Sequence, residues 1–233
     1  MKSLPVLLSL VVLTMTSGCF FAKSGAKLNE LSSAEKKAGW KLLFDGKSLA
    51  GWRNYRKPDA PKQGWVVEEG CLKLKQKGGG DIITTEKFAD FDLRWEWKIP
   101  AKSNSGLKYL VSENRSAPGP EYQMIDDAVA EPANRRTASF YDVLPKDKNG
   151  PTLINEWNSS RIVVRGNRVE HWLNGETVLA YTLGSPELKA ALAQSKFKDI
   201  PNFGDKIKGH ILLTDHNDES WFRNIKIREL VDR

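Results

Sequence analysis

A strict alternation of apolar and charged residues makes residues 91–99 the most constraining stretch of this sequence. The apolar positions are Phe91, Leu93, Trp95, Trp97 and Ile99, and the charged positions are Asp92, Arg94, Glu96 and Lys98. Successive side chains of a strand point to opposite faces, so this pattern predicts a half-buried β-strand. Trp95 and Trp97 are therefore assigned to the core ahead of any sugar-binding role.

Short strand-like runs joined by turn signals continue along the chain. Residues 161–179 read as a three-stranded meander, in which Asn174-Gly175 is the strongest hairpin signal. One short helix is expected at residues 186–194, with Ser185 as its cap. Many short strands and little helix predict an all-β fold, a two-sheet antiparallel sandwich of which the jelly roll is one form.

The amino terminus resembles a bacterial export signal of the lipoprotein type. Lys2 precedes an apolar run, and small residues lead to Cys19. We expect residues 1–18 to be the signal peptide, Cys19 to carry the lipid and residues 19–38 to form a tether. This places the protein, exported and lipid-anchored, in the cell envelope, in the periplasm or at the outer-membrane surface. Simple secretion with cleavage nearby is the alternative.

The length of the chain favours a single domain, at residues 39–231, and its charge distribution does not favour nucleic-acid binding. The 233 residues are 40% hydrophobic, which suits a single sandwich. The net charge of +7 comes from 36 basic and 29 acidic residues spread along the chain. Nucleic-acid binding requires a clustered basic footprint, so none is expected, and the only expected membrane contact is the lipid anchor.

A polar cluster after Pro120 contains two carboxylates and an amide. Glu121 and Gln123 are two residues apart and share a face of a strand. Asp126 joins that face only if one bulge residue intervenes. Such a group suits acid–base chemistry or sugar binding, although an ordinary polar strand end is the alternative.

The three histidines differ in their expected roles. His171 shares parity with apolar neighbours, which favours a structural histidine over a substrate-binding one. His210 is expected at the surface. His216 lies at the end of a strand, where it is either a site residue or a turn residue. Tyr109 is one of several aromatic residues that can stack on a sugar or pack in the core.

No signature of a zinc hydrolase, a nucleotide-binding loop or a serine hydrolase is present. A divalent cation held by carboxylate oxygens is left open, because such sites have no single fixed spacing.

Several stretches, taken together and in order, resemble the 3-keto-disaccharide hydrolase domain family. They are residues 39–52 (GWKLLFDGKSLAGW), 103–106 (SNSG), 119–126 (GPEYQMID), 155–158 (NEWN), 162–175 (IVVRGNRVEHWLNG) and 209–228 (GHILLTDHNDESWFRNIKIR). The resemblance implies a concanavalin A-like lectin/glucanase jelly roll with a carbohydrate as substrate.

The family's implied reaction is elimination followed by hydration. A ketone at sugar C3 acidifies the hydrogen on C2, a base removes it, and the C1–O bond then breaks. The resemblance implies Glu121 and Asp126 as acid and base, individually unassigned, with His216 as an alternative base. Three further residues are candidates to bind hydroxyls or the oxyanion: Gln123, Asn104 and Arg223. A divalent cation is a further candidate electrophile.

Two other functions remain open at this point. A non-catalytic carbohydrate-binding module shares the expected fold, and fold does not fix function. A conventional two-carboxylate glycosidase would use Glu121 and Asp126 at a defined separation. The sequence leaves the sugar linkage and the oligomeric state undetermined.

Overall fold

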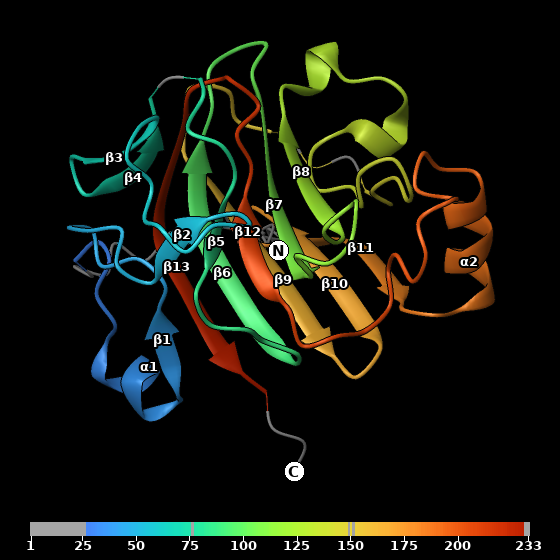
Figure 1. The fold of residues 1–233 in the computed structure, drawn as a ribbon, viewed down its shortest axis with the longest axis horizontal. Helices are drawn as coiled ribbons and strands as arrows, with labels where there is room; N and C mark the ends of the chain where they lie inside the picture. Colours follow the sequence, from blue (N-terminus) through green and yellow to red (C-terminus); the bar gives the residue numbers. More distant parts are fainter. Residues whose placement is uncertain (1–26, 76, 149, 151, 231–233) are drawn as a thin grey trace, which may run out of the picture.

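The computed structural model describes residues 27–75, 77–148, 150 and 152–230. Within them the chain forms thirteen strands in two antiparallel sheets (Figure 1). This confirms the predicted all-β sandwich. No helix among the described residues is long and apolar enough to cross a membrane.

The larger sheet has eight strands, in the order β11-β10-β9-β6-β13-β4-β3, with β1 paired to β13. Their bounds are β1 Trp40–Leu42, β3 Trp65–Glu68, β4 Cys71–Leu74, β6 Phe91–Lys98, β9 Asn158–Arg165, β10 Arg168–Leu173, β11 Glu176–Thr182 and β13 Ser220–Glu229. The alternating stretch of the sequence is β6, in the middle of this sheet. Leu93 and Trp97 are fully buried there, as its period of two predicts.

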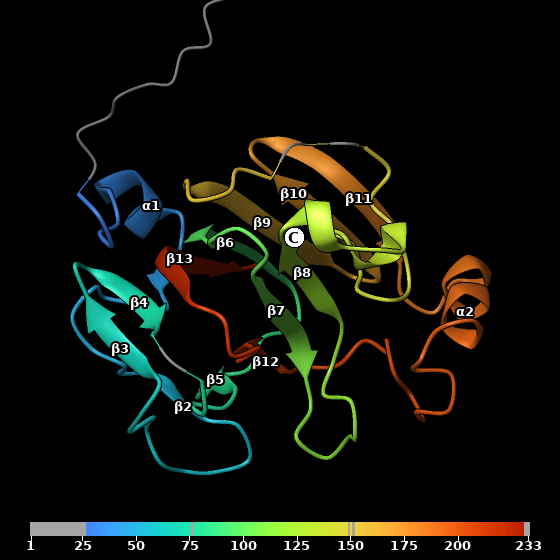
Figure 2. The same cartoon turned by 90° about the horizontal axis from the view of Figure 1, so that it is seen from above.

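The smaller sheet has five strands, in the order β2-β5-β12-β7-β8. Their bounds are β2 Trp52–Asn54, β5 Ile82–Thr84, β7 Asn104–Val111, β8 Glu121–Ile125 and β12 His210–Leu213. Figure 2 shows β7 between β8 and β12, which are distant from each other in sequence.

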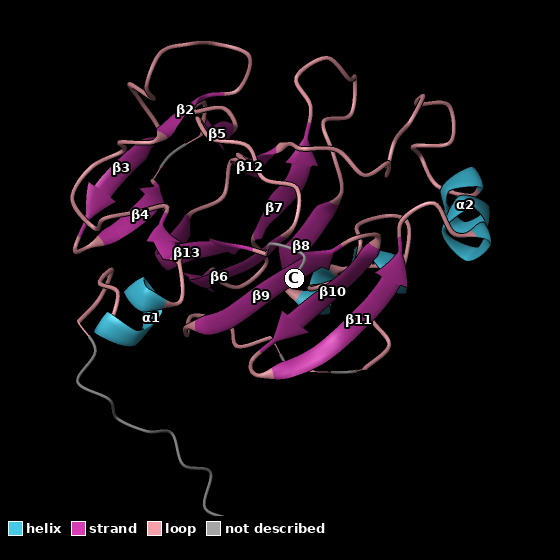
Figure 3. Cartoon of the chain, turned by 90° about the horizontal axis from the view of Figure 1, so that it is seen from below, coloured by secondary structure: helices cyan, strands magenta, loops and turns pink. Residues whose placement is uncertain are grey.

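Two short α-helices lie at opposite ends of the molecule (Figure 3). Helix α2, Pro186–Ala193, is the predicted one, and the Ser185 side chain accepts a hydrogen bond from the Leu188 amide. Helix α1, Ser33–Lys37, lies within the expected tether, where the sequence also allows one helical turn. A capping box between Ser32 and Glu35 satisfies its first amides. Two 3-10 turns, η1 Asp127–Val129 and η2 Ala133–Arg135, follow β8.

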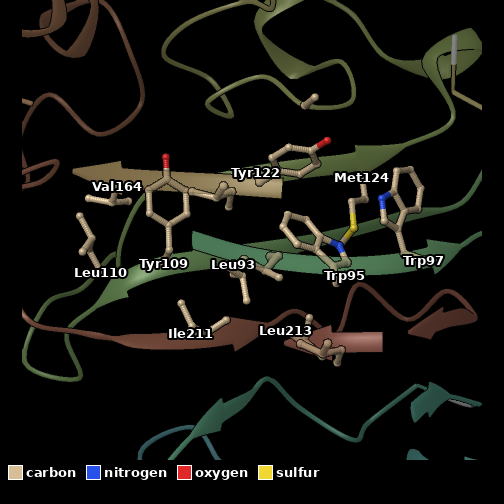
Figure 4. Packing of buried hydrophobic residues seen from close by; sticks show 14 of the residues in the cluster. Leu93, Trp95, Trp97, Tyr109, Leu110, Tyr122, Met124, Val164, Ile211 and Leu213 are labelled. Atoms are coloured by element: carbon tan, nitrogen blue, oxygen red, sulfur yellow. The ribbon is translucent and has the colours of Figure 1, made fainter. Parts of the chain in front are cut away.

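The core between the sheets is rich in aromatic residues (Figure 4). Trp95 of β6 meets Tyr122 of β8 edge to face, with ring centroids 5.0 Å apart. Tyr122 and Met124 both point into this core. Because side chains alternate along a strand, Glu121 and Gln123 must lie on the opposite, outer face of the five-stranded sheet.

The expected tether contacts the sandwich before the expected domain start. Asn29 is buried, and its backbone amide donates to the side-chain oxygen of Asn224 at 2.7 Å. Its side-chain amide donates to the Gly70 carbonyl at 2.8 Å. The expected signal peptide, residues 1–18, and Cys19 lie outside the described residues.

Candidate active site

Strand register gathers polar side chains on the outer face of the five-stranded sheet. In the β7–β8 pair, Lys108 lies opposite Glu121, and Gly106 lies opposite Gln123. On the other side of β7, the Thr214 amide donates to the Gly106 carbonyl at 3.1 Å. Strands β8, β7 and β12 therefore present one continuous surface at this point.

Gly106 makes room for the side chain of Glu121. A Cβ atom at position 106 would lie 2.1 Å from Oε1 of Glu121, so the carboxylate would have to move from its place. The carboxylate therefore extends over β7, into space that any other residue at position 106 would fill. This arrangement gives a functional reason for the glycine in the Ser-Asn-Ser-Gly motif.

Glu121 is the best-defined ionisable group of the site. Its side chain is 7% exposed, with Nζ of Lys108 at 3.6 Å from Oε2 and Nε2 of His216 at 3.5 Å from Oε1. Burial raises the pKa of Glu121, but the charge of Lys108, the interaction with His216 and a contribution from Lys196 outweigh it. The pKa therefore lies below its ordinary value, and Glu121 is an ionised carboxylate.

A second carboxyl group, Asp81, borders the same cluster with the opposite shift. It immediately precedes β5, and its Oδ1 accepts a hydrogen bond from the Asp215 amide at 2.9 Å. Burial raises the pKa of Asp81 above its ordinary value, although Lys108 and His216 act in the opposite sense and Glu121 adds to the rise. The site thus pairs one carboxyl group whose pKa is lowered with one whose pKa is raised.

His216 lies in the loop after β12, with 35% of its side chain exposed. The neighbouring Asp215 holds this loop, because its Oδ1 accepts from the Asn217 amide and its Oδ2 accepts from the Gly80 amide, both at 2.8 Å. The sequence left His216 open as a site residue or a turn residue. Its side chain lies beside Glu121, with Nε2 at 3.5 Å from Oε1.

Asn104 and Gln123 also lie at this face. The backbone amide of Asn104 donates to Asp218 at 2.8 Å, and its side-chain oxygen is buried without a hydrogen-bond partner among the described residues. Gln123 is 2% exposed, and its Oε1 accepts from the Met124 amide at 3.3 Å. Both keep a place at the site, where Asn104 offers an open acceptor.

Asp126 does not join Glu121, contrary to the bulge that the sequence analysis considered. The pairing of β7 with β8 runs without a register shift up to Ile125. Asp126 instead caps η1, where Oδ1 accepts from the Ala128 amide at 3.0 Å and Oδ2 accepts from the Lys102 amide at 2.8 Å. Asp126 is five positions along the chain from Glu121, which corresponds to about 16 Å between the Cα atoms of an extended strand.

Tyr109 and His171 belong to the core and not to the substrate surface. Both are 0% exposed. The two ring nitrogens of His171 lie 2.8 Å from the Tyr109 hydroxyl and 2.8 Å from the Ala138 carbonyl oxygen, and Tyr109 also contacts the hydroxyl of Tyr181. Desolvation lowers the pKa of His171 to about 4. This buried network leaves no surface for a sugar.

Arg223 lies on the other sheet. Its neighbour Phe222 is buried in the core, so Arg223 points outward from β13. There its Nε donates to Glu96 at 2.7 Å, and its guanidinium lies 3.8 Å from the ring centroid of Trp157. It cannot contact a substrate held at Glu121.

His210 is buried, with Nδ1 at 2.7 Å from the Thr84 carbonyl oxygen, and not at the surface as expected. This contact joins the first residue of β12 to the last residue of β5.

The sequence analysis missed Lys108 and Asp81. A lysine within the otherwise apolar run Leu107 to Val111 was the available signal for the first. Nothing local marked Asp81, whose importance comes from strands that meet only in the fold. The described residues contain no group of three or more His, Cys, Asp or Glu side chains arranged to hold a metal ion.

The two-sheet β-sandwich is the fold of a glycosyl hydrolase-like protein, and one of its sheet faces carries a buried carboxylate, a lysine and a histidine. The chain belongs to the 3-keto-alpha-glucoside-1,2-lyase-like domain family, whose model matches residues 39–228. It is 33% identical over 242 aligned residues to a 3-keto-disaccharide hydrolase of Bacteroides thetaiotaomicron, covering 88% of this chain and 83% of that protein. The family resemblance seen in the sequence is therefore confirmed.

Solved structures agree with this assignment. A candidate glycosyl hydrolase of Parabacteroides distasonis is 34% identical, with a TM-score of 0.79, and the match covers 88% of this chain and all of that one. A second candidate glycosyl hydrolase of the same organism is 26% identical, with a TM-score of 0.63, over 82% of this chain and 99% of that one.

Proposed function

We propose that this protein is a glycoside hydrolase that cleaves 3-keto-disaccharides by elimination and hydration, with Glu121 as the base. The family and the 33% identical hydrolase support the substrate class. The observation that carries the residue assignment is a buried carboxylate, kept ionised, between Lys108 at 3.6 Å and His216 at 3.5 Å.

The first step needs a base and a stabilised enolate. The ketone at C3 acidifies the C2 hydrogen, which Glu121 removes while the C2–H electrons delocalise onto the C3 oxygen. Lys108 is the positive group beside Glu121 and carries the role of stabilising that oxyanion. The side chain of Lys108 is 17% exposed, so it is partly desolvated. Its charge therefore interacts more strongly with a nearby oxyanion than it would in bulk water.

The second step expels the leaving sugar. The enolate electrons form a C1=C2 double bond as the C1–O bond breaks, and the leaving oxygen requires a proton. Asp81 is our acid, because burial raises its pKa while the pKa of Glu121 is lowered. Water then adds its hydroxyl to C1 and its proton to C2, which completes a net hydrolysis. His216 contacts Glu121 and is the alternative base.

The decisive experiment compares a 3-keto-disaccharide with its unoxidised parent. Turnover of the keto sugar alone is expected, because without the ketone a side-chain base cannot remove the C2 hydrogen. In deuterated water the product should gain deuterium at C2. Glu121→Gln should reduce kcat by about 10²–10⁴-fold, whereas Asp126→Asn, a matched carboxylate-to-amide change, should retain the chemistry.

Other outcomes identify the competing functions. Binding of either sugar without cleavage, with divalent metal supplied, would indicate a carbohydrate-binding module. Equal cleavage of both sugars would indicate a conventional glycosidase. If His216→Ala abolishes turnover while Glu121→Gln does not, His216 is the base. Loss of activity in EDTA would show a metal role.

We further propose that the protein is a lipid-anchored lipoprotein of the cell envelope, attached through Cys19. The basic start, the apolar run and the small residues before Cys19 support this location. Stable anchoring requires more than one acyl chain, which a lipoprotein cysteine supplies.

A further inference from the structure

A pocket of about 370 Å³ lies beside the cluster of Glu121, Lys108, Asp81 and His216, with Asp81 common to both. Its lining comes from the loop that follows β2 and from the glycine tract before β5. The lining includes Tyr55, Lys57, Asp59, Lys62, Gln63 and Asp81. The volume falls in the range of small-molecule sites, and the lining is mainly polar.

The pocket joins the catalytic cluster through Asp81. This carboxyl group lines the pocket and also interacts electrostatically with Lys108, His216 and Glu121. Tyr55, at the pocket, packs on a small apolar cluster of Ile83, Val111 and Leu212. Leu212 pairs with Ile83 on one side and with Lys108 on the other, so this cluster lies between the pocket and Lys108. A ligand reaching from Glu121 past Asp81 would enter this pocket.

Hydrogen bonds fix the two loops that form the pocket. The Tyr55 amide donates to the Asp81 carbonyl at 2.9 Å, and the Gln63 side chain donates to the Gly78 carbonyl at 2.9 Å. The Gly80 amide donates to Asp215 at 2.8 Å, which ties the pocket to the loop of His216. The pocket is thus preformed and connected to the site.

Close backbone approach explains the glycine at the centre of the tract. A Cβ on Gly79 would lie 3.0 Å from the Trp65 ring and 3.1 Å from the Gln63 carbonyl oxygen. A side chain at this position would therefore push the two loops apart. The glycine allows the loops to meet and leaves backbone groups at the pocket wall.

We propose that this pocket is the leaving-group subsite, which binds the hydroxyl-rich sugar that departs from C1. The inference rests on the proposed function. Asp81 must protonate the leaving oxygen, so the departing half of the disaccharide lies on the Asp81 side of the scissile bond. Lys57 and Lys62 offer ammonium donors, and Asp59 offers a carboxylate acceptor, to sugar hydroxyls there.

The test compares two substrates in the full chain. One is a 3-keto-disaccharide whose leaving group is a hexose, and the other is the methyl 3-keto-glucoside, whose leaving group is too small to occupy the pocket. The variants are Lys57→Ala with Lys62→Ala, which removes two exposed donors, and Asp59→Trp, which blocks the pocket. For the disaccharide, kcat/KM should fall by about 10-fold or more, the effect of losing one or two hydrogen bonds.

For the methyl glycoside, kcat/KM should stay within about twofold of wild type. The matched control, Lys36→Ala with Lys37→Ala, removes the same charge from α1, beside the other sheet, and should leave both substrates unaffected. Equal losses for both substrates, or no loss for the disaccharide in either pocket variant, would overturn the subsite. Failure of the wild type to cleave either substrate would instead refute the proposed function, and the subsite with it.

Discussion

Replacing Lys108 by methionine tests whether the lysine keeps Glu121 ionised. The Nζ to Oε2 distance is 3.6 Å, with the two side chains 17% and 7% exposed. At an effective dielectric constant of about 20, Coulomb attraction between the two charges is worth about 4–5 kcal/mol before solvent screening. Because the charge of Lys108 helps to lower the pKa of Glu121, removing the lysine should raise that pKa.

The direction follows from the role of Glu121 as base. The base must be ionised, so its pKa sets the acidic limb of the profile of kcat/KM against pH. Lys108→Met should move that limb to higher pH and lower the plateau by about 10²–10³-fold, since the oxyanion loses its positive group. Lys108→Arg should restore most of the limb position.

The assay measures kcat/KM on the 3-keto-disaccharide from pH 4 to 9. Lys189→Met, an exposed lysine on α2, is the matched control and should reproduce the wild-type profile. Thermal unfolding of each variant separates kinetic from folding effects. An acidic limb that stays in place in a folded Lys108→Met protein would refute the assignment of Glu121 as the base held ionised by Lys108.

Three further predictions concern residues away from the reacting atoms. His171 has a folded pKa of about 4 against 6.5 unfolded, so the unfolded state binds more protons between these values, and stability should fall by up to about 3 kcal/mol as the pH drops through that window. Urea unfolding of His171→Gln should show that slope removed, and an unchanged slope would assign it to other groups. Arg223→Ala should keep kcat/KM within about twofold, because its partner Glu96 lies on the other sheet, and a loss of 10²-fold would return Arg223 to the active site. Cys19→Ser should move the protein from the membrane to the soluble fraction on cell fractionation, and a wild type that is already soluble would contradict the lipid anchor.

The sequence by itself determined the sandwich and the family. The alternation in residues 91–99 specified a central strand, because a strand with one buried face must follow a period of two. Ser185 specified the start of α2, since its side chain satisfies an amide that the helix leaves free. These are local rules, which operate within a few residues of the chain.

Only the tertiary structure decided which charged residues act together. Lys108, Glu121, Asp81 and His216 come from two strands and two strand ends whose register brings them to one sheet face. The sequence identified Glu121, with His216 as an alternative base, but paired Glu121 with Asp126. Register and the environment of each carboxyl group depend on long-range packing, and a charge acts over distance in space, irrespective of its separation along the chain.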